Sequence, residues 1–331
     1  MSFTIFITAK TLAPSGMERL KSAGCTLLFI EHANSSDEVR SILQSQPIDG
    51  VISRSVDLSG DAIRACPTLK VISKHGVGVN NIDVEAATRR NIPVYITLSA
   101  NTQSVAELTV GLMLAAARRI SFVDRELHAG RWSRLQDGLQ LAGRRLGLLG
   151  FGQIGQCVAR ACLALGMRVL SFDPALKGPN PIPSVSIVSS MEDLLRQSDI
   201  LSLHVPLTAR TRKLIGAGEL ALLPPQAILI NTARGEVVDE DALVTALKSG
   251  ALFAAGLDAL IEEPLPANSP LASLPNVVLT PHIGASTSAA LDAMAEGAAA
   301  NILGFLFGNT VDAAYCVNPQ VLSNNQKESA E

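Results

Sequence analysis

The chain has 331 residues, of which 47% are hydrophobic and 17% are charged, and its formal net charge is −3. Its length exceeds the usual size of a single core, so two domains are expected. The sequence has no basic excess to attract polyanions, and no run approaches about 18 uninterrupted apolar residues, so nucleic-acid and membrane partners are both disfavoured. Because the first residues lack a signal-peptide pattern, a cytoplasmic protein is expected.

The five cysteines are scattered, without a CxxC pair or a His–Cys cluster of metal-ligand spacing. Cys157 and Cys162 lie five residues apart on one predicted helix, which favours neither a disulfide nor a zinc site. Free thiols and no bound metal are therefore expected.

Short β-rich runs alternate with amphipathic segments through the first hundred residues. Strands are predicted at 3–8, 26–30, 50–53, 69–73 and 93–96, and helices at 15–23, 36–44 and 84–90. Strands that alternate with helices indicate βαβ units and a parallel sheet. This part of the chain is expected to form a small α/β domain.

A polar break at 99–104 precedes an uninterrupted helical pattern at 105–120. Ser104 is a suitable N-cap, and Glu107, three residues later, completes a capping box. The helix is too apolar for an exposed connector, so we expect it to pack between the domains, against a second subunit, or both. Residues 121–145 show no clean periodicity and carry the only tryptophan, Trp132, so an arm or loop is expected there.

The segment 146–155, LGLLGFGQIG, predicts a strand, a tight glycine turn and a helix N-terminus. Such a turn cradles a dinucleotide pyrophosphate, although glycine turns also serve purely structural connections. Asp173 ends the next predicted strand, at the spacing of an acid that binds the adenosine ribose. Its carboxylate favours NAD over NADP, while the nearby cation Lys177 weakens that preference.

Strands and helices continue to alternate after the turn. Further strands are predicted at 168–172, 199–204, 227–231, 254–257 and 276–280, and an alanine-rich helix from 286 to about 307. Polar stretches at 231–235, 258–264 and 281–285 follow the ends of the last three strands, where open α/β sheets bind their ligands.

A 2-keto acid reductase needs a cation for the substrate carboxylate and carbonyl, a proton donor, and a carboxylate that keeps the donor charged. Arg234, His282 and Glu263 are residues of those three types in the three polar stretches. A surface ion pair, a buried histidine and a solvated loop acid are the structural alternatives.

Together these motifs resemble those of the D-isomer-specific 2-hydroxyacid dehydrogenases, most nearly the phosphoglycerate-dehydrogenase-like and hydroxypyruvate-reductase-like members. The resemblance extends from Arg54 to about Pro319, through HGVGVNNIDVEAATRRNIPV, NTQSVAELTVGLML, GLLGFGQIG, HVPLT, NTARGEVVDEDAL, GLDALIEEPLP and PHIGAST. It implies an α/β fold of two Rossmann-like parallel-sheet domains, with the nucleotide domain inserted into a flavodoxin-like substrate domain. Residues 1–99 and 287–331 would form the substrate domain and 100–286 the NAD-binding domain, with a dimerisation arm at about 101–142 that forms a homodimer.

The resemblance also implies NAD-dependent hydride transfer to or from a small 2-keto or 2-hydroxy acid of the phosphoglycerate or hydroxypyruvate/glyoxylate type. Arg234 would orient the substrate, and Glu263 would pair with His282, which moves the proton. The implied cofactor contacts are Gly150, Gly152, Gln153, Ile154, Gly155, Asp173, His204, Val205, Pro206, Thr232, Ala233, Arg234, Asp258, His282 and Gly284. The implied substrate contacts are Arg54, Lys74, His75, Gly76, Val77, Gly78, Arg234 and His282.

The substrate itself stays open. Arg54 and Lys74 are candidates to bind a distal phosphate or sulfonate, and Arg134 to reach a neighbouring active site, unless all three are solvated surface charges. Many phosphoglycerate-type relatives carry arginine where this chain has Lys74, which is followed by His75, and lysine cannot reproduce a bidentate arginine fork. A non-catalytic, NAD(H)-sensing protein similar to a corepressor is the alternative function.

Overall fold

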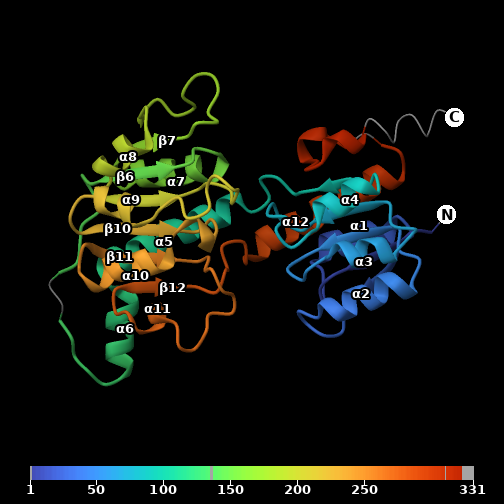
Figure 1. Ribbon diagram of the computed structural model, residues 1–331, viewed down its shortest axis with the longest axis horizontal. Helices are drawn as coiled ribbons and strands as arrows, with labels where there is room; N and C mark the ends of the chain where they lie inside the picture. The colour runs from blue at the N-terminus through green and yellow to red at the C-terminus, as the bar shows by residue number, and fades with distance from the viewer. Residues whose placement is uncertain (1, 135–136, 310, 323–331) are drawn as a thin grey trace. The chain divides into compact units, whose positions relative to one another are not determined.

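The structure of the chain is a computed structural model that describes residues 2–134, 137–309 and 311–322. The chain divides into two compact units (Figure 1). Unit 1 comprises Met1–Asn101 and Thr287–Glu331, and unit 2 comprises Thr102–Ser286. Unit 2 is therefore an insertion between the two segments of unit 1.

Unit 1 contains a five-stranded parallel sheet. Its strands are β1 (Thr4–Ile7), β2 (Thr26–Phe29), β3 (Gly50–Ser53), β4 (Val71–Lys74) and β5 (Val94–Tyr95). They pair in the order β2-β1-β3-β4-β5, which is the flavodoxin-like order. All five lie within or next to the predicted strand ranges.

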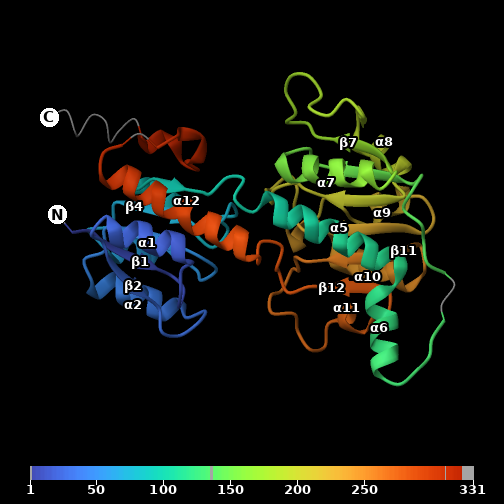
Figure 2. The same cartoon turned by 180° about the vertical axis from the view of Figure 1, so that it is seen from behind.

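Helices cover both faces of this sheet. The strands require this cover because their side chains are apolar on both faces. The helices are α1 (Pro14–Ser22), α2 (Ser36–Ser45), α3 (Gly60–Ala65), α4 (Val84–Arg89) and α12 (Ser288–Leu306), followed by short 3₁₀ turns at Ala313–Tyr315 and Pro319–Val321. Residues of α2, α3 and α4 pack with one set of alternating strand residues, and those of α1 and α12 with the other. Figure 2 shows α1 and α12 side by side over the sheet.

By length and composition alone, α12 is long and apolar enough to cross a membrane. Its packing gives a different explanation of its composition, because its buried residues join α1, β3 and β4 in one core. Its polar residues also bind α1: the backbone N–H of Ser15 lies 3.2 Å from Oδ1 of Asp292, and Arg19 forms an ion pair with Glu296. Thus α12 is a core helix of unit 1.

Unit 2 contains a seven-stranded parallel sheet. Its strands are β6 (Arg145–Leu149), β7 (Arg168–Phe172), β8 (Val185–Ile187), β9 (Ile200–Leu203), β10 (Ala227–Asn231), β11 (Leu252–Leu257) and β12 (Val277–Leu279). They pair in the order β12-β11-β10-β9-β6-β7-β8. This is a Rossmann order, in which the direction of winding reverses between β6 and β9. The glycine turn follows β6 and therefore lies at this topological switch point, where such sheets bind nucleotides.

The helices of unit 2 surround this sheet (Figure 1). They are α5 (Thr102–Arg118), α6 (Ile120–His128), α7 (Gln153–Ala164), α8 (Met191–Gln197), α9 (Ala217–Leu222), α10 (Glu240–Lys248) and α11 (Pro270–Ser273), with a 3₁₀ turn at Gly235–Val237. The apolar helix α5 packs against α7, β10 and β11, so much of its apolar surface is covered within unit 2.

Two local predictions in this region are wrong. Helix α5 begins at Thr102, so Ser104 lies inside it and is not the N-cap, and Glu107 accepts a hydrogen bond from Gln103 (2.8 Å). The segment expected to be irregular from 121 onwards begins instead with α6. Ile120, Val123 and Leu127 follow a helical spacing that the surrounding charges obscure, and the left-handed backbone of Arg119 (φ 56°) separates α6 from α5.

The contact between α1 and α12 provides a test of the packing of unit 1. A Cβ on Gly16 would lie 2.7 Å from the carbonyl oxygen of Ala295, so Gly16→Ala should lower the free energy of unfolding by about 1–3 kcal/mol through overpacking. Gly218→Ala in α9 is the matched control, because a Cβ there meets no atom within 4 Å. The control should be neutral or stabilising by up to about 1 kcal/mol. Chemical denaturation measures both, and equal stability of the two variants would contradict the packing.

Candidate active site

The glycine turn after β6 combines close backbone packing with open space. Gly150 has φ +98°, and a Cβ there would lie 2.5 Å from the carbonyl oxygen of His204. A Cβ on Gly155 would lie 2.6 Å from the carbonyl oxygen of Gly150, whereas one on Gly152 would meet no atom within 4 Å. The turn is therefore compact underneath and open at Gly152, the N-cap of α7, where a pyrophosphate can approach the helix N-terminus.

Asp173 follows β7 and is tied to this turn. Its Oδ2 accepts a hydrogen bond from the backbone N–H of Phe151 (2.8 Å), and its Oδ1 accepts one from that of Ala175 (2.8 Å). The carboxylate is thus held beside the turn, where it can accept a ribose hydroxyl and repel a 2′-phosphate. Lys177 is exposed and forms no ion pair with Asp173 within the described part of the chain.

His204, after β9, lies on the other side of the turn. Its Nε2 is 2.9 Å from Oγ of Ser202, and its ring edge lies 3.7 Å from where a Cβ on Gly155 would be. Burial lowers the pKa of His204 to about 4, so the imidazole is neutral at physiological pH. The turn therefore has a neutral hydrogen-bonding ring beside it.

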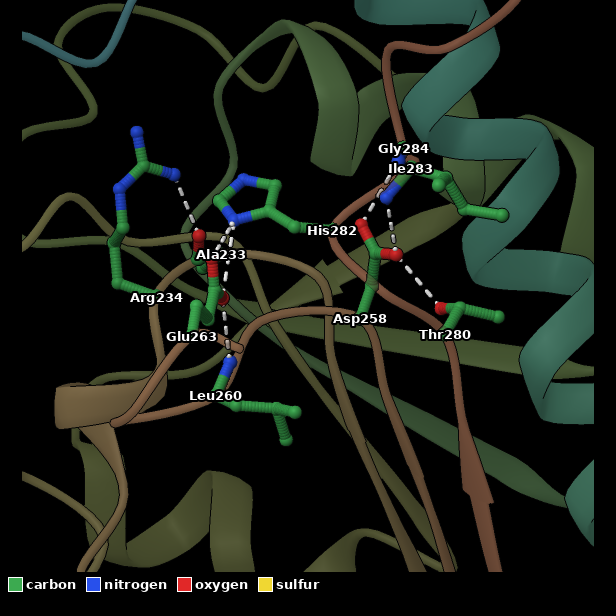
Figure 3. Close-up of polar contacts among 9 residues, drawn as sticks. All are labelled: Ala233, Arg234, Asp258, Leu260, Glu263, Thr280, His282, Ile283 and Gly284. Carbon is green, nitrogen blue, oxygen red and sulfur yellow. Dashed lines mark hydrogen bonds and ion pairs between the residues drawn. The ribbon is translucent and has the colours of Figure 1, made fainter. Parts of the chain in front are cut away.

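The three candidate catalytic residues come from loops that follow β10, β11 and β12, which are neighbours in the sheet. Figure 3 shows the imidazole of His282 above the carboxylate of Glu263, with Arg234 on the side away from Asp258. Nδ1 of His282 lies 3.1 and 2.9 Å from the two carboxylate oxygens of Glu263. Nδ1–H therefore donates to Glu263, and Nε2 has no hydrogen bond to any described residue.

The electrostatics of this pair favour its charged form. The hydrogen bond from His282 to Glu263 raises the pKa of His282 against the opposing effects of burial and of Arg234. Burial alone would raise the pKa of Glu263, but hydrogen bonds from His282 and from the Leu260 N–H lower it instead. The imidazole consequently stays protonated to a higher pH than a free histidine, with its second N–H available for a ligand.

Asp258 determines the backbone conformation that presents His282. His282 has φ +53°, a left-handed conformation that is strained for a non-glycine residue. The buried Asp258 carboxylate accepts hydrogen bonds from Thr280 Oγ1 (2.7 Å) and from the N–H groups of Ile283 (2.8 Å) and Gly284 (2.9 Å). Its carbonyl oxygen accepts one from the His282 N–H (2.9 Å). Asp258 therefore fixes the turn at residues 282–284. Thr280, for which the sequence suggested no role, donates a hydrogen bond that helps to hold the Asp258 carboxylate.

The loop that carries Arg234 is fixed by Asn231, for which the sequence suggested no role. Asn231 is buried at the end of β10; its Nδ2 donates to the Arg234 carbonyl (2.9 Å), and its Oδ1 accepts from the Ala233 N–H (3.0 Å). Nη1 of Arg234 donates to the Ala233 carbonyl (2.6 Å), and burial lowers the pKa of Arg234. A Cβ on Gly235 would lie 2.0 Å from the carbonyl carbon of Leu260, so this loop packs directly on the one that carries Glu263.

The remaining candidate substrate residues belong to unit 1. Gly76 has φ +128°, and its N–H donates to Oγ1 of Thr97 (2.9 Å), whereas the N–H groups of Val77 and Gly78 have no hydrogen bond to a described residue. Nε2 of the adjacent His75 lies 3.2 Å from the carbonyl oxygen of Leu291 in α12. Burial, and then the positive charge of Arg54, lower the pKa of His75 to about 4. The loop thus has two available N–H donors beside a neutral histidine.

Comparison with known proteins identifies the family. The family model described as "D-isomer specific 2-hydroxyacid dehydrogenase, NAD binding domain" matches residues 110–284. The chain belongs to this family. The predicted family and enzyme class, and NAD as cofactor, are thereby confirmed, and the α/β prediction with two parallel sheets is confirmed by the structure.

Individual relatives agree with this assignment. The chain is 45% identical over 242 residues to a D-3-phosphoglycerate dehydrogenase of Methanocaldococcus jannaschii, a match that covers 72% of this chain but only 46% of that protein. It is 44% identical over 256 residues to a glyoxylate reductase of Aeropyrum pernix, covering 75% of this chain and 76% of that protein. The crystal structure of the TT0316 protein of Thermus thermophilus superposes with a TM-score of 0.87 at 37% identity, covering 95% of this chain and 100% of that one.

The coupling between Glu263 and His282 can be measured without any substrate. Glu263→Gln removes the charged acceptor, so the pKa of His282 should fall from its raised value, as read from the imidazole resonances in an NMR titration. Glu262→Gln changes the same charge one residue earlier and should leave the His282 titration where it was. An unchanged pKa in Glu263→Gln would show that the ion pair does not form in solution.

Proposed function

We propose that the chain catalyses reversible hydride transfer between NAD(H) and a small 2-keto or 2-hydroxy acid. The observation that carries the proposal is the His282–Glu263 hydrogen bond, which raises the pKa of His282 and leaves its Nε2 available at the strand ends of an NAD-binding sheet. A non-catalytic sensor of NAD(H) has no comparable need for a histidine whose pKa is raised by a carboxylate.

In this mechanism the bound nicotinamide supplies or accepts the hydride, and the chain's own residues manage the substrate and the proton. Arg234 binds the substrate carboxylate and polarises its carbonyl group. Nε2 of His282 donates a proton to the carbonyl oxygen during reduction, and it accepts one from the hydroxyl group during oxidation. Glu263 keeps His282 oriented and stabilises its charged form.

The cofactor contacts are proposed from the geometry of the glycine turn. Gly152 and the N-terminus of α7, including Gln153 and Ile154, bind the pyrophosphate, and Asp173 accepts the ribose hydroxyl groups. The residues proposed to contact the rest of the cofactor are His204, Val205, Pro206, Thr232, Ala233, Arg234, Asp258, His282 and Gly284.

The proposed substrate contacts are Arg54, Arg234 and the loop that follows β4. The free N–H groups of Val77 and Gly78 bind carboxylate oxygens, as does Arg234. Arg54 is the proposed contact for a second anionic group, because its guanidinium has neither a hydrogen bond nor an ion pair with a described residue. Relatives include a glyoxylate reductase and a phosphoglycerate dehydrogenase, so both substrate types enter the test.

The test is the oxidation of NADH with glyoxylate, hydroxypyruvate, phosphohydroxypyruvate, 2-ketogluconate and sulfopyruvate. His282→Asn should reduce kcat by about 10²–10⁴-fold while NADH binding persists, because only proton transfer is lost. The exposed His32→Asn is the control and should keep full activity. For reduction, kcat/KM should fall as pH rises through the raised pKa of His282, and oxidation should show the opposite trend. NADH binding without turnover of any acid would support the sensor instead.

We also propose that the chain is a cytoplasmic homodimer, with α6 and the following segment as the contact arm. No residue of α6 is buried, and Ile120, Leu127 and Trp132 expose 51%, 51% and 80% of their surfaces. An apolar face of this kind is typical of a protein–protein contact. Residues 135–136 of the predicted arm lie outside the described residues.

Light scattering on the purified protein tests this arm. The double variant Ile120→Asp/Leu127→Asp should convert the dimer to a monomer, because two charges would be buried without partners. Ile187→Asp, on β8, also places an aspartate at an exposed isoleucine and should leave the dimer intact. A monomeric wild type, or a double variant that stays dimeric, would exclude this contact.

A further inference from the structure

Arg54 lies directly after β3, and side chains from other segments hold both polar groups of its backbone. Its N–H donates to Oγ1 of Thr8 (2.9 Å), which follows β1. Its carbonyl oxygen accepts hydrogen bonds from Nδ2 of Asn81 (3.0 Å) and from the ammonium group of Lys74, at the end of β4. Thr8 and Lys74 are only 1% and 9% exposed, so these bonds are shielded from water.

Asn81 connects this arrangement into a network. Its Oδ1 accepts a hydrogen bond from Nζ of Lys74 (2.6 Å), and its Nδ2 also lies within reach of Oγ of Ser53 (3.1 Å) and the carbonyl oxygen of Val56 (2.7 Å). One amide group therefore holds the turn that begins at Ser53, and the lysine charge strengthens its bonds. We call Thr8, Lys74 and Asn81 the Arg54 cradle.

The side chain of Arg54, unlike its backbone, lacks hydrogen-bonding partners among the described residues. The guanidinium has no hydrogen bond or ion pair with any described residue, yet burial lowers the pKa of Arg54. The neighbouring imidazole of His75 is neutral and therefore adds no second positive charge beside Arg54, but it cannot supply a negative one. A partly buried cation without an acidic partner among the described residues is costly, and an anionic ligand would offset that cost.

We propose that Lys74 and Asn81 are positioning residues: they fix the backbone of Arg54 so that its guanidinium meets a second anionic group of the substrate, and Lys74 itself does not bind the substrate. This assignment rests on the proposed function, because it requires a 2-keto acid at the loop 75–78. It revises the expectation that Arg54 and Lys74 are both candidates to bind a distal phosphate or sulfonate. In this assignment Lys74 donates hydrogen bonds to the Arg54 carbonyl and to Asn81, and the guanidinium of Arg54 binds the substrate.

Hydrogen–deuterium exchange tests the cradle without any turnover. Lys74→Met and Asn81→Ala should each accelerate exchange in a peptide that spans residues 50–58, because the turn loses a hydrogen-bonding partner. Lys70→Met is the matched control, since Lys70 is exposed and pairs with Asp49 outside the cradle. Unchanged exchange in Lys74→Met and Asn81→Ala would overturn the cradle.

Steady-state kinetics then test its effect on the substrate. Lys74→Met and Asn81→Ala should each raise KM for phosphohydroxypyruvate or sulfopyruvate by about tenfold, with a smaller effect on kcat and on KM for glyoxylate, and the double variant should be little worse than either. Arg54→Gln should raise the same KM values and supplies the reference for a direct ligand. Multiplying effects in the double variant, or an effect of Lys74→Met without one of Asn81→Ala, would make Lys74 a direct ligand and overturn the proposal.

The outcomes also separate this inference from the proposed function. A wild type that reduces glyoxylate but neither phosphohydroxypyruvate nor sulfopyruvate would overturn the second anionic group while leaving the dehydrogenase intact. A wild type that reduces no acid of the panel would overturn the proposed function, and with it the assigned substrate. In that case the exchange measurement would still decide whether Lys74 and Asn81 hold the Arg54 backbone.

Discussion

The site depends on the parallel pairing of β10, β11 and β12. Because adjacent parallel strands end at the same edge of a sheet, three polar loops that are far apart in sequence are brought together at their carboxyl ends. Arg234, Glu263 and His282 are each supplied by one of these loops. The hydrogen bond between His282 and Glu263 then follows from strand order, and Asp258 and Asn231 hold the loops in place with backbone hydrogen bonds.

Each of these fixing interactions uses a buried polar group at a strand end. Asp258 satisfies the N–H groups of a left-handed turn, and Asn231 satisfies both a donor and an acceptor of its own loop. Buried polar groups that are fully paired rigidify their surroundings, whereas half-paired ones are costly. The strained backbone of His282 is therefore stable because its neighbours are satisfied, and the imidazole is presented in one orientation.

Much of this architecture was predictable from the sequence. The strands are short apolar runs with polar ends, and eleven of the twelve match predicted ranges to within two residues. The exception is β8, an edge strand of which only Val185 is buried. The glycine turn and Asp173 were recognisable because their spacing is set by one βαβ unit. The start of α5 was predicted wrongly: the helix begins at Thr102, before Ser104. The side chain of Glu107, which a capping box at Ser104 would require, accepts a hydrogen bond from Gln103 instead.

The contacts between loops could not be predicted in the same way. Nothing in the spacing shows that Lys74 turns inward to Arg54 and Asn81, because a lysine at this position could equally bind a ligand or join a network of hydrogen bonds within the loop. Likewise, the sequence shows a glycine at position 235, but it does not show that this glycine packs against the backbone of Leu260. Such contacts join residues separated by seven to more than twenty positions and depend on tertiary structure alone.

The contact between Gly235 and Leu260 limits which substitutions and movements the two loops can accept. Since no side chain fits between the two backbones, the loop of Arg234 cannot shift without displacing the loop of Glu263. The positions of Arg234 and Glu263 are therefore coupled through the backbones of their loops. The proposed substrate residues Arg54, His75 and Val77 belong to unit 1, a separate compact unit, so under the proposed function substitutions at these residues would leave the contact between Gly235 and Leu260 unchanged.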